Sequence, residues 1–563
     1  MVRLFIGEKH IEIHKDRNDT DSMALLSQIP YVHSNRILTE FKTSVTNIDL
    51  VLKLFKGIDV HNPDDDFYST APQRIINIVE KELQRRRVTA SLLDSGPIGD
   101  PGFLFTHQQL GRELSLVNDR FAFFYDTRTG KTPMSLQIIA DDVRQNPDSK
   151  WLILCPLILI ENAWLEDADK MFPDLSVVSL HARTKKKRLE QFAKKANVYI
   201  CNIESFCSYQ EQIEALGIYG CFVDESSTMK SNSSKFGKAA VEFAQKCTKW
   251  YLLSGTPAPN GEYEYYRQLQ SIDYYGVPSS FNKFKVHFFN NNSRNPQYED
   301  LVIKPERKDE LLNLLRKYSL YVDKEDVLET PGRDFYEIEV TMPKELKDKY
   351  NELRRELALR VNKNVTITAP SEAAKLNKLN QVTSGFVIDT DAVFHNKIDE
   401  HKIVDTHILS MYRFDRLMAL LDEIGDEQAI IWCNFRKEFE IIKDLIGDKC
   451  GFVYGDVNIS EKNRVIRDFK DGKLQYLIAN PASADKGLTL TNAHIAIYFS
   501  MNYSYELWKQ SIERIYGSII KQPKRCKYYI FIAPGTVDRV IYNAVMNKGI
   551  MGIEVLNHLK GGT

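Results

Sequence analysis

The chain has 563 residues, too many for one compact domain, and its length suggests about three or four domains. With 43% hydrophobic and 27% charged residues it can bury large cores, and this composition excludes a disordered chain. The 75 Lys and Arg residues balance 76 Asp and Glu residues at a net charge of −1, which excludes a polycationic coat or tail protein. A local basic groove that binds nucleic acid is compatible with this balance.

The cysteines and the apolar segments indicate the cellular compartment in which the protein is expected. The eight cysteines form no CxxC pair, and the closest two, Cys201 and Cys207, are spaced wrongly for a zinc knuckle. We therefore expect a reducing compartment and no structural zinc site. The N-terminus lacks the apolar segment of a signal peptide, and the most apolar stretch, 151–160, falls short of the ~20 residues of a membrane helix. We expect a cytoplasmic protein that makes no membrane contact.

Residues 1–93 are expected to form a small α+β domain. Alternating apolar residues on either side of Gly7 predict a β-hairpin, at Leu4, Ile6, Ile11 and Ile13. Apolar residues four positions apart then predict a helix, with Ile75, Val79 and Leu83 on its apolar face and Arg85, Arg86 and Arg87 at its end. Two prolines and three glycines within 94–102 predict a linker after this domain.

Two α/β lobes are predicted after the linker. Between 103 and 259, apolar strand-like runs alternate with amphipathic helices, which predicts a parallel sheet covered by helices on both faces. Residues 396–550 show the same alternation, whereas the segment 260–395 is richer in charge and in helical periodicity. The predicted fold class is therefore α/β, with two parallel-sheet lobes, a helical insertion and inter-lobe linker between them, and a C-terminal tail at 551–563.

A Gly-Lys-Thr sequence predicts a phosphate-binding loop. It directly follows the predicted strand 121–125 and precedes a predicted helix, as such loops do. In this context the Lys131 ammonium reaches the β- and γ-phosphate oxygens and the Thr132 hydroxyl ligates Mg²⁺, which makes ATP and Mg²⁺ the expected cofactors. Thr129 and Gly130 complete the loop. A solvated Gly-Lys turn is the alternative interpretation.

Two positions of this loop depart from the usual pattern. Tyr125 stands where the first glycine is usual, and Arg128 stands where a further loop glycine is common. Arg128 could supply an extra contact to the phosphates of ATP, or it could simply point to solvent.

An acidic pair ends a second predicted strand. Asp224 and Glu225 follow the apolar run 221–223, which is the position of a Walker B element. There Asp224 would hold Mg²⁺ through water, and Glu225 would orient or deprotonate the water that attacks the γ-phosphate. An exposed loop with two acidic residues is the alternative interpretation.

Further short motifs accompany these two along the chain. In its first half they are His107-Gln108, Leu154-Cys155-Pro156 with Trp164 and Glu166, Asp224 to Ser227 with Lys230-Ser231, and Leu253 to Pro257 with Asn260. In its second half they are Gly487 to Leu490 with Ala493, Gln510 with Arg514, and Pro534 to Asp538. In this order, over residues 104–548, the set resembles the motifs of the superfamily-two helicase-like ATPases, and within them the Swi/Snf type of double-stranded DNA translocase.

The resemblance implies two RecA-like lobes that close on ATP. Gln108 is then the residue that reads the adenine, and Gly487 belongs to the nucleotide site. The motif 254–257 is implied to couple the nucleotide state to the grip on DNA. The implied catalytic residues are Lys131, Asp224, Glu225, Gln510 and Arg514, with Arg514 facing the other lobe.

Two positions depart from the family pattern. Ser227 replaces a histidine, and Gly517 stands where the family has a second arginine, three residues after Arg514. Such arginines stabilise charge on the γ-phosphate, an effect worth ~10³–10⁵ in rate in other enzymes. Loss of this second arginine would weaken ATP hydrolysis, or a nearby basic residue would stabilise the γ-phosphate charge in its place, namely Lys521, Lys524 or Arg525.

The resemblance also implies partners and DNA contacts. Duplex or forked DNA is the expected partner, and a DNA-processing system could add protein partners. The 1–93 domain is either an accessory domain, as in annealing and fork-remodelling relatives, or a stabilising extension. Candidate DNA contacts are Ser205, Lys230 and Asn480, and the basic run of Lys185, Lys186, Lys187 and Arg188, which could equally be a solvated helix face.

The predicted function is that of an ATP-dependent double-stranded DNA translocase that remodels duplex, forked or protein-bound DNA. Because contacts to the DNA backbone carry no sequence information, we expect little sequence specificity and a strong salt dependence. Two alternatives stay open: a strand-separating DNA or RNA helicase, and a nucleotide-binding DNA clamp with impaired turnover. Gly517 favours the clamp, whereas the intact Lys131, Asp224 and Glu225 oppose it.

Overall fold

The computed structural model divides the chain into two compact units. Unit 1 runs to Val327, and unit 2 comprises Leu328–Ile550. In the described part of the chain no helix has both the length and the apolar character needed to cross a membrane. The described residues are 2–6, 9–15, 20–35, 37–47, 50–51, 54, 60–61, 71–99, 102–293, 299–356, 358–360, 366–368, 372–388, 406–455, 459–483 and 489–547.

A small sheet begins unit 1, with its strands in the order β3-β4-β2-β1-β5. The predicted hairpin is confirmed, because β1 pairs antiparallel with β2 and places Leu4 opposite Ile13. Alternate side chains of these strands pack with helix α1 in one apolar cluster. The elements are β1 Val2–Ile6, β2 His10–Lys15, α1 Thr20–Leu26, β3 His33–Ser34, β4 Glu40–Ser44, η1 Val45–Asn47 and β5 Val60–His61.

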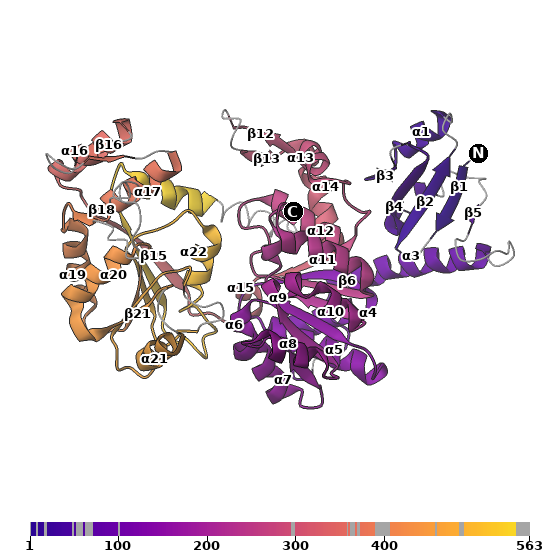
Figure 1. Ribbon diagram of the computed structural model, residues 1–563, viewed down its shortest axis with the longest axis horizontal. Coiled ribbons are helices and arrows are strands. Elements are labelled where there is room, and N and C mark those ends of the chain that lie inside the picture. Colours follow the sequence, from indigo (N-terminus) through magenta and orange to yellow (C-terminus); the bar gives the residue numbers. More distant parts are fainter. Residues whose placement is uncertain are drawn as a thin grey trace. The chain divides into compact units, whose positions relative to one another are not determined.

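A long helix, α3 (Ala71–Ser95), connects this sheet to the first lobe (Figure 1). The predicted helix end at Arg87 is wrong, because α3 continues for about two more turns until Gly96 adopts a φ of +80°. Ile78 packs in the core of the small sheet, whereas Leu92 packs in the core of the lobe. Apolar contacts with a second core thus extend the helix past its arginines.

Arg85 and Arg86 lie within α3 and not at its end, and their side chains bond to neighbouring groups. Arg85 and Arg86 both donate to the buried carboxylate of Glu82, and Arg85 also donates to Asn118 of the lobe at 2.6 Å. They are therefore not cations that complement a helix C-terminus. Further contacts join the small sheet to the lobe, among them Tyr31, which donates to Glu310 at 2.6 Å, and His33 Nε2, which donates to the Val277 carbonyl at 2.9 Å.

The first lobe is built on a seven-stranded parallel sheet of order β14-β6-β11-β10-β7-β9-β8. Its central strands are almost wholly apolar because apolar clusters cover both sheet faces. The predicted parallel sheet is thus confirmed. Its strands are β6 Arg120–Tyr125, β7 Trp151–Cys155, β8 Val177–Ser179, β9 Val198–Asn202, β10 Gly220–Val223, β11 Lys249–Leu253 and β14 Ser319–Val322.

Helices connect these strands in the alternation that the sequence predicts. The segment after β7 includes one turn of π-helix, η2, which carries Trp164 into the core. The helices are α4 Thr106–Val117, α5 Lys131–Gln145, α6 Leu157–Leu159, η2 Ile160–Leu165, α7 Glu166–Met171, α8 Lys185–Phe192, α9 Ile203–Ser208, α10 Gln210–Ala215, η3 Ser226–Met229 and α11 Lys235–Lys246.

The segment 260–395, predicted as a helical insertion and inter-lobe linker, is shared between the two units. It adds β14 to the edge of the first sheet and β15 (Arg333–Glu339) to the edge of the second. β15 is largely exposed and β14 is only four residues long, so neither shows the long apolar run of a central strand. Besides β14, the part of this segment in unit 1 forms η4 Glu262–Glu264, α12 Tyr265–Ile272, α13 Phe281–Phe288, β12 Phe289–Asn291, β13 Leu301–Ile303, α14 Pro305–Tyr318 and α15 Lys324–Val327.

Unit 2 is built on a six-stranded parallel sheet of order β15-β24-β23-β20-β22-β21. This second sheet confirms the predicted α/β class with two parallel-sheet lobes. Its elements after β15 are α16 Lys344–Glu356, β16 Ala358–Arg360, β17 Thr366–Thr368, α17 Glu372–Thr383, β18 Phe386–Ile388, β19 Thr406–Ile408, α19 Tyr412–Ile424, β20 Ala429–Trp432, α20 Arg436–Ile446, η5 Gly447–Lys449, β21 Cys450–Val453, α21 Ile459–Lys470, β22 Tyr476–Ala479, β23 Ile495–Tyr498, α22 Tyr505–Ile512 and β24 Cys526–Ile532.

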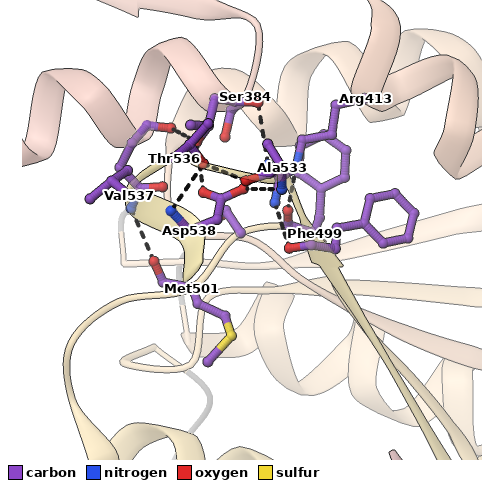
Figure 2. Close-up of polar contacts among 12 residues, drawn as sticks. Ser384, Arg413, Phe499, Met501, Ala533, Thr536, Val537 and Asp538 are labelled. Atoms are coloured by element: carbon purple, nitrogen blue, oxygen red, sulfur yellow. Dashed lines mark hydrogen bonds and ion pairs between the residues drawn. The ribbon is translucent and has the colours of Figure 1, made fainter. Parts of the chain in front are cut away.

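A buried ion pair ties the end of this unit to its middle (Figure 2). The guanidinium of Arg413, in α19, lies 2.6 Å from the Asp538 carboxylate and also donates to the carbonyls of Phe499 and Phe531. Asp538 accepts further bonds from the Ala533 amide and from the Thr383 hydroxyl. The Gly-Thr-Val-Asp motif thus has a structural role in unit 2.

Candidate nucleotide-binding site

The predicted phosphate loop, acidic pair and Ser-Gly-Thr-Pro motif follow neighbouring strands. β6, β11 and β10 lie side by side and parallel, so the loops after their carboxyl ends meet at one edge of the sheet. Ligands of open α/β sheets bind at this edge. A Cβ on Gly255 would lie 3.3 Å from the Thr127 amide nitrogen, which shows that two of these loops are in direct contact.

The phosphate loop closes on itself between β6 and α5. Gly130 caps α5 in the left-handed region, at a φ of +80°, and Arg128 also has a positive φ of +64°. The Thr129 hydroxyl donates to the Asp126 carbonyl at 2.7 Å. The Lys131 ammonium donates to the carbonyls of Tyr125 and Asp126, at 2.9 and 3.1 Å, and so lies over the loop where a phosphate-binding lysine is needed.

Gln108 and His107 of α4 hold this loop from the other side. The Gln108 amide donates to the carbonyls of Thr129 and Gly130 at 3.0 and 3.2 Å, and its oxygen accepts the Phe105 amide. The His107 ring nitrogen Nε2 lies 2.7 Å from the Thr129 carbonyl and must donate, since a carbonyl only accepts. Adenine recognition by Gln108 stays a prediction, while its contact with the phosphate loop is a finding that the motif did not indicate.

Replacing Gly130 with alanine should weaken ATP binding by at least about tenfold. A Cβ at Gly130 would lie 1.9 Å from the Gln108 side-chain nitrogen, and the backbone there has a φ of +80°. Titration with a fluorescent ATP analogue measures the change. Gly96→Ala is the matched control, because Gly96 has the same φ and no atom within 4 Å of its would-be Cβ. Equal losses in both variants would show that backbone strain alone, and not the Gln108 contact, matters.

The acidic pair lies beside the loop, with Asp224 buried and Glu225 half-buried. Asp224 accepts the Trp164 indole N–H at 3.0 Å through one oxygen and the Glu225 amide at 2.9 Å through the other. Burial and the neighbouring Glu225 carboxylate raise the pKa of Asp224, and the Lys131 ammonium opposes this shift. Lys131, predicted to bind the phosphates, and Asp224, predicted to bind Mg²⁺, therefore lie close enough to interact.

The backbone at this acidic pair has an unusual conformation. Glu225 has a φ of +53°, in the left-handed region that residues with a Cβ rarely adopt. Strained backbone of this kind concentrates at functional sites. Next to it, the Ser227 hydroxyl, at the position where the family pattern has a histidine, is buried and has no hydrogen-bond partner within the described residues.

The predicted site residues of unit 2 lie near α22. Gln510 and Arg514 are both mostly buried, and the Arg514 carbonyl accepts the Leu490 amide at 2.8 Å. Gly487 lies outside the described residues. Within unit 2, Gln510 thus lies on α22, and Arg514 lies two residues after its end, in backbone contact with Leu490 of the Gly487–Leu490 motif.

Two of the basic residues that could replace the missing arginine are engaged elsewhere on unit 2. Lys524 pairs with Glu427 at 3.0 Å, and Arg525 pairs with both oxygens of Asp334 at 2.5 and 2.7 Å. Lys521 has no ion-pair partner in the part of unit 2 that is described. Exposed pairs are weak, so these contacts reduce rather than remove the availability of the two side chains.

The candidate DNA contacts divide into exposed and structural residues. Arg188 is half-buried, lies over the Tyr209 ring at 5.3 Å and donates to the Ala182 carbonyl, whereas Lys185, Lys186 and Lys187 of α8 are exposed. Asn480 holds the turn after β22 by donating to the Asn434 carbonyl at 3.1 Å and accepting the Ala482 amide. Ser205 is buried in α9, and Lys230 is half-buried after η3.

Comparisons with known proteins agree with this arrangement. Residues 121–406 match the model of the SNF2-related domain, and residues 412–516 match that of the helicase conserved C-terminal domain. The chain is 24% identical over 402 residues to putative protein p41 of Acyrthosiphon pisum secondary endosymbiont phage 1, which covers 69% of this chain and 82% of that protein.

A longer relative comes from Drosophila melanogaster. It is named SWI/SNF-related matrix-associated actin-dependent regulator of chromatin subfamily A-like protein 1, and the two are 22% identical over 464 residues. The match covers 80% of this chain but 54% of that protein, so the chain spans about half the length of this relative. A solved structure, the Sulfolobus solfataricus SWI2/SNF2 ATPase core in complex with dsDNA, is 18% identical to this chain. The match covers 80% of this chain and 96% of that one, with a TM-score of 0.35.

Proposed function

Because the chain belongs to the SNF2-related family of helicase-like, nucleic-acid-dependent ATPases, we propose that it is an ATP-dependent translocase on double-stranded DNA. It would remodel duplex, forked or protein-bound DNA with little sequence specificity. The observation that carries this proposal is the meeting of the phosphate loop, the acidic pair and the Ser-Gly-Thr-Pro motif at one sheet edge of a lobe that matches the SNF2-related model. The Drosophila relative's name, a regulator of chromatin, supports DNA as the substrate.

The residues of the site fit ATP and Mg²⁺. We assign Lys131 to the phosphate oxygens, Thr132 and the buried Asp224 to the metal, and Glu225 to the proton of the attacking water. Bound Mg²⁺ supplies positive charge to the phosphate oxygens. Closure of unit 2 would add Gln510 and Arg514 to this set. Gln108, which bonds to the phosphate loop, would select the adenine base of ATP.

Motion along DNA would follow from this closure. Each unit would grip the sugar-phosphate backbone, and alternating closure and release would step the chain along one strand. The proposed grip residues are Ser205 and Asn480, which follow strands β9 and β22, and Lys230, which follows η3. The exposed lysines of α8 add positive charge that attracts the duplex.

Hydrolysis of ATP measured in parallel with no nucleic acid, duplex DNA, forked DNA, single-stranded DNA and RNA tests the proposal. Duplex or forked DNA should stimulate hydrolysis most, and the purified chain should displace a protein bound to duplex DNA. Stimulation by RNA, or release of one strand from a partial duplex, would instead favour the strand-separating helicase. No stimulation by any nucleic acid would contradict the translocase.

Removal of two α8 lysines should weaken duplex binding and lower its salt dependence. In the Lys185→Ala/Lys186→Ala variant we expect the slope of log K against log salt to fall by roughly one for each DNA phosphate that the variant no longer neutralises. The double variant Lys344→Ala/Lys347→Ala is the control, because it removes two exposed lysines of α16. An unchanged slope in the α8 variant would mean that α8 is a solvated face with no DNA contact.

A DNA clamp with impaired turnover is the second candidate function. It is favoured by Gly517 together with the ion pairs that engage Lys524 and Arg525. A chain that binds ATP and duplex DNA but hydrolyses ATP no faster than Glu225→Gln would support the clamp and contradict the translocase.

A further inference from the structure

One buried side chain of α12 joins two loops of the nucleotide site. The oxygen Oε1 of Gln268 accepts the hydroxyl of Ser226, directly after Glu225, at 2.9 Å. Its nitrogen Nε2 donates to the Pro257 carbonyl, at the end of the Ser-Gly-Thr-Pro motif, at 2.7 Å. Gln268 is 1% exposed and Ser226 is 0% exposed, so water does not compete for these bonds.

The residue that precedes α12, at the end of η4, holds the segment that follows the Ser-Gly-Thr-Pro motif. Glu264, one turn before Gln268, accepts the backbone amide of Asn260 at 3.0 Å and its side-chain amide at 2.7 Å. The second proton of the Gln268 amide goes to the Glu264 carbonyl at 3.3 Å. All hydrogen-bonding atoms of the Gln268 side chain are thereby satisfied, and each of its contacts involves one of the two loops or its own helix.

We propose that Gln268 is a positioning residue that couples the Glu225-bearing loop to the Ser-Gly-Thr-Pro loop. A carboxamide, unlike an aliphatic side chain, both accepts and donates, so a shift of one loop is passed to the other through two directional bonds. The Ser-Gly-Thr-Pro loop in turn contacts the phosphate loop at Thr127. Gln268 thus sets where the Glu225 carboxylate stands when the loop beside the phosphates moves.

Gln268 differs from an ordinary polar core residue because its side chain bonds to two different loops. Leucine at this position would fill a similar volume but leave the Ser226 hydroxyl and the Pro257 carbonyl without a partner in a dry interior, which permits both loops to shift. Such a shift changes the position of Glu225 without removing any group that binds ATP. The expected signature is a lower kcat at a nearly constant KM for ATP.

Gln268→Leu is the test variant, and Gln270→Leu is its matched control. Gln270 lies two residues further along α12 and is 3% exposed, and its side chain bonds to Tyr266 and Arg267 rather than to either loop. We expect Gln268→Leu to lower the kcat for ATP hydrolysis by about tenfold and to change the KM for ATP by less than about twofold. The control should keep both constants within about twofold of wild type, even if both variants lose thermal stability equally.

A double-mutant cycle with Ser226→Ala measures the coupling directly. If the two side chains act through one bond, Ser226→Ala/Gln268→Leu should lose no more activity than Gln268→Leu alone. Fully multiplicative losses, or an equal loss of kcat in Gln270→Leu, would overturn the proposal and leave Gln268 as a packing residue.

The DNA part of this inference rests on the proposed translocase function. Duplex affinity is measured with ADP and with a non-hydrolysable ATP analogue, and the ratio of the two affinities should move towards one in Gln268→Leu only. If the wild-type chain binds duplex DNA equally tightly with ADP and with the ATP analogue, so that this ratio is already one, the translocase proposal fails. Gln268 is then judged on hydrolysis without nucleic acid, where a rate equal to wild type would refute it.

Discussion

Glu225→Gln should lower the rate of ATP hydrolysis by about 10²–10⁴-fold while leaving ATP binding nearly unchanged. Glutamine has the same shape as glutamate but cannot take up the proton of the attacking water. The Asp224 and Lys131 contacts that fit ATP and Mg²⁺ stay in place, because the Glu225 amide rather than its side chain bonds to Asp224. Single-turnover hydrolysis and titration of a fluorescent ATP analogue separate the two effects.

Glu242→Gln is the control for this substitution, since Glu242 is an exposed glutamate of α11 in the same lobe. It should hydrolyse ATP at the wild-type rate. Lys131→Ala should lose ATP binding as well as turnover, because it removes the cation that lies over the phosphate loop. Near-normal hydrolysis by Glu225→Gln would mean that another group activates the water, and the assignment of Glu225 would fall.

Asp538→Ala should destabilise unit 2 by about 3–5 kcal/mol. Arg413 is 1% exposed, and its guanidinium loses its only carboxylate partner in the described part of unit 2 when Asp538 is removed (Figure 2). An uncompensated charge in a dry core costs several kcal/mol, even though the intact pair itself adds little stability. Since the chain has two units, hydrogen exchange in β20, β23 and β24 reports on unit 2 alone.

The neighbouring exposed ion pair supplies the control. Arg539 lies 2.7 Å from Glu337, and about a third of each side chain is exposed. Glu337→Ala should therefore cost less than about 1 kcal/mol. If Asp538→Ala were no more destabilising than Glu337→Ala, the buried cluster of Arg413 would not hold the end of unit 2 in place.

The class of fold and the positions of the principal motifs could be predicted from the order of the amino acids. Strands buried on both faces, such as 121–125 and 151–155, must be apolar throughout, so they stand out as runs between amphipathic helices. Parallel strands place their carboxyl ends at one edge, and the residues that follow them, Lys131 and Asp224, are therefore predicted at one site without knowledge of side-chain contacts. The match to the family models bears out the family that the motifs resemble.

Contacts between residues far apart in the chain could not be predicted in this way. Gln268 and Ser226 are 42 positions apart, and Arg413 and Asp538 are 125 apart, so no local pattern links them. A glutamine in a helix and a serine in a loop are usually solvated, and burial alone turns them into a directional pair. The continuation of α3 to Ser95 and the edge strands β14 and β15 likewise depend on partners supplied by other segments, because local propensity is too weak to fix an element that gains its stability from packing.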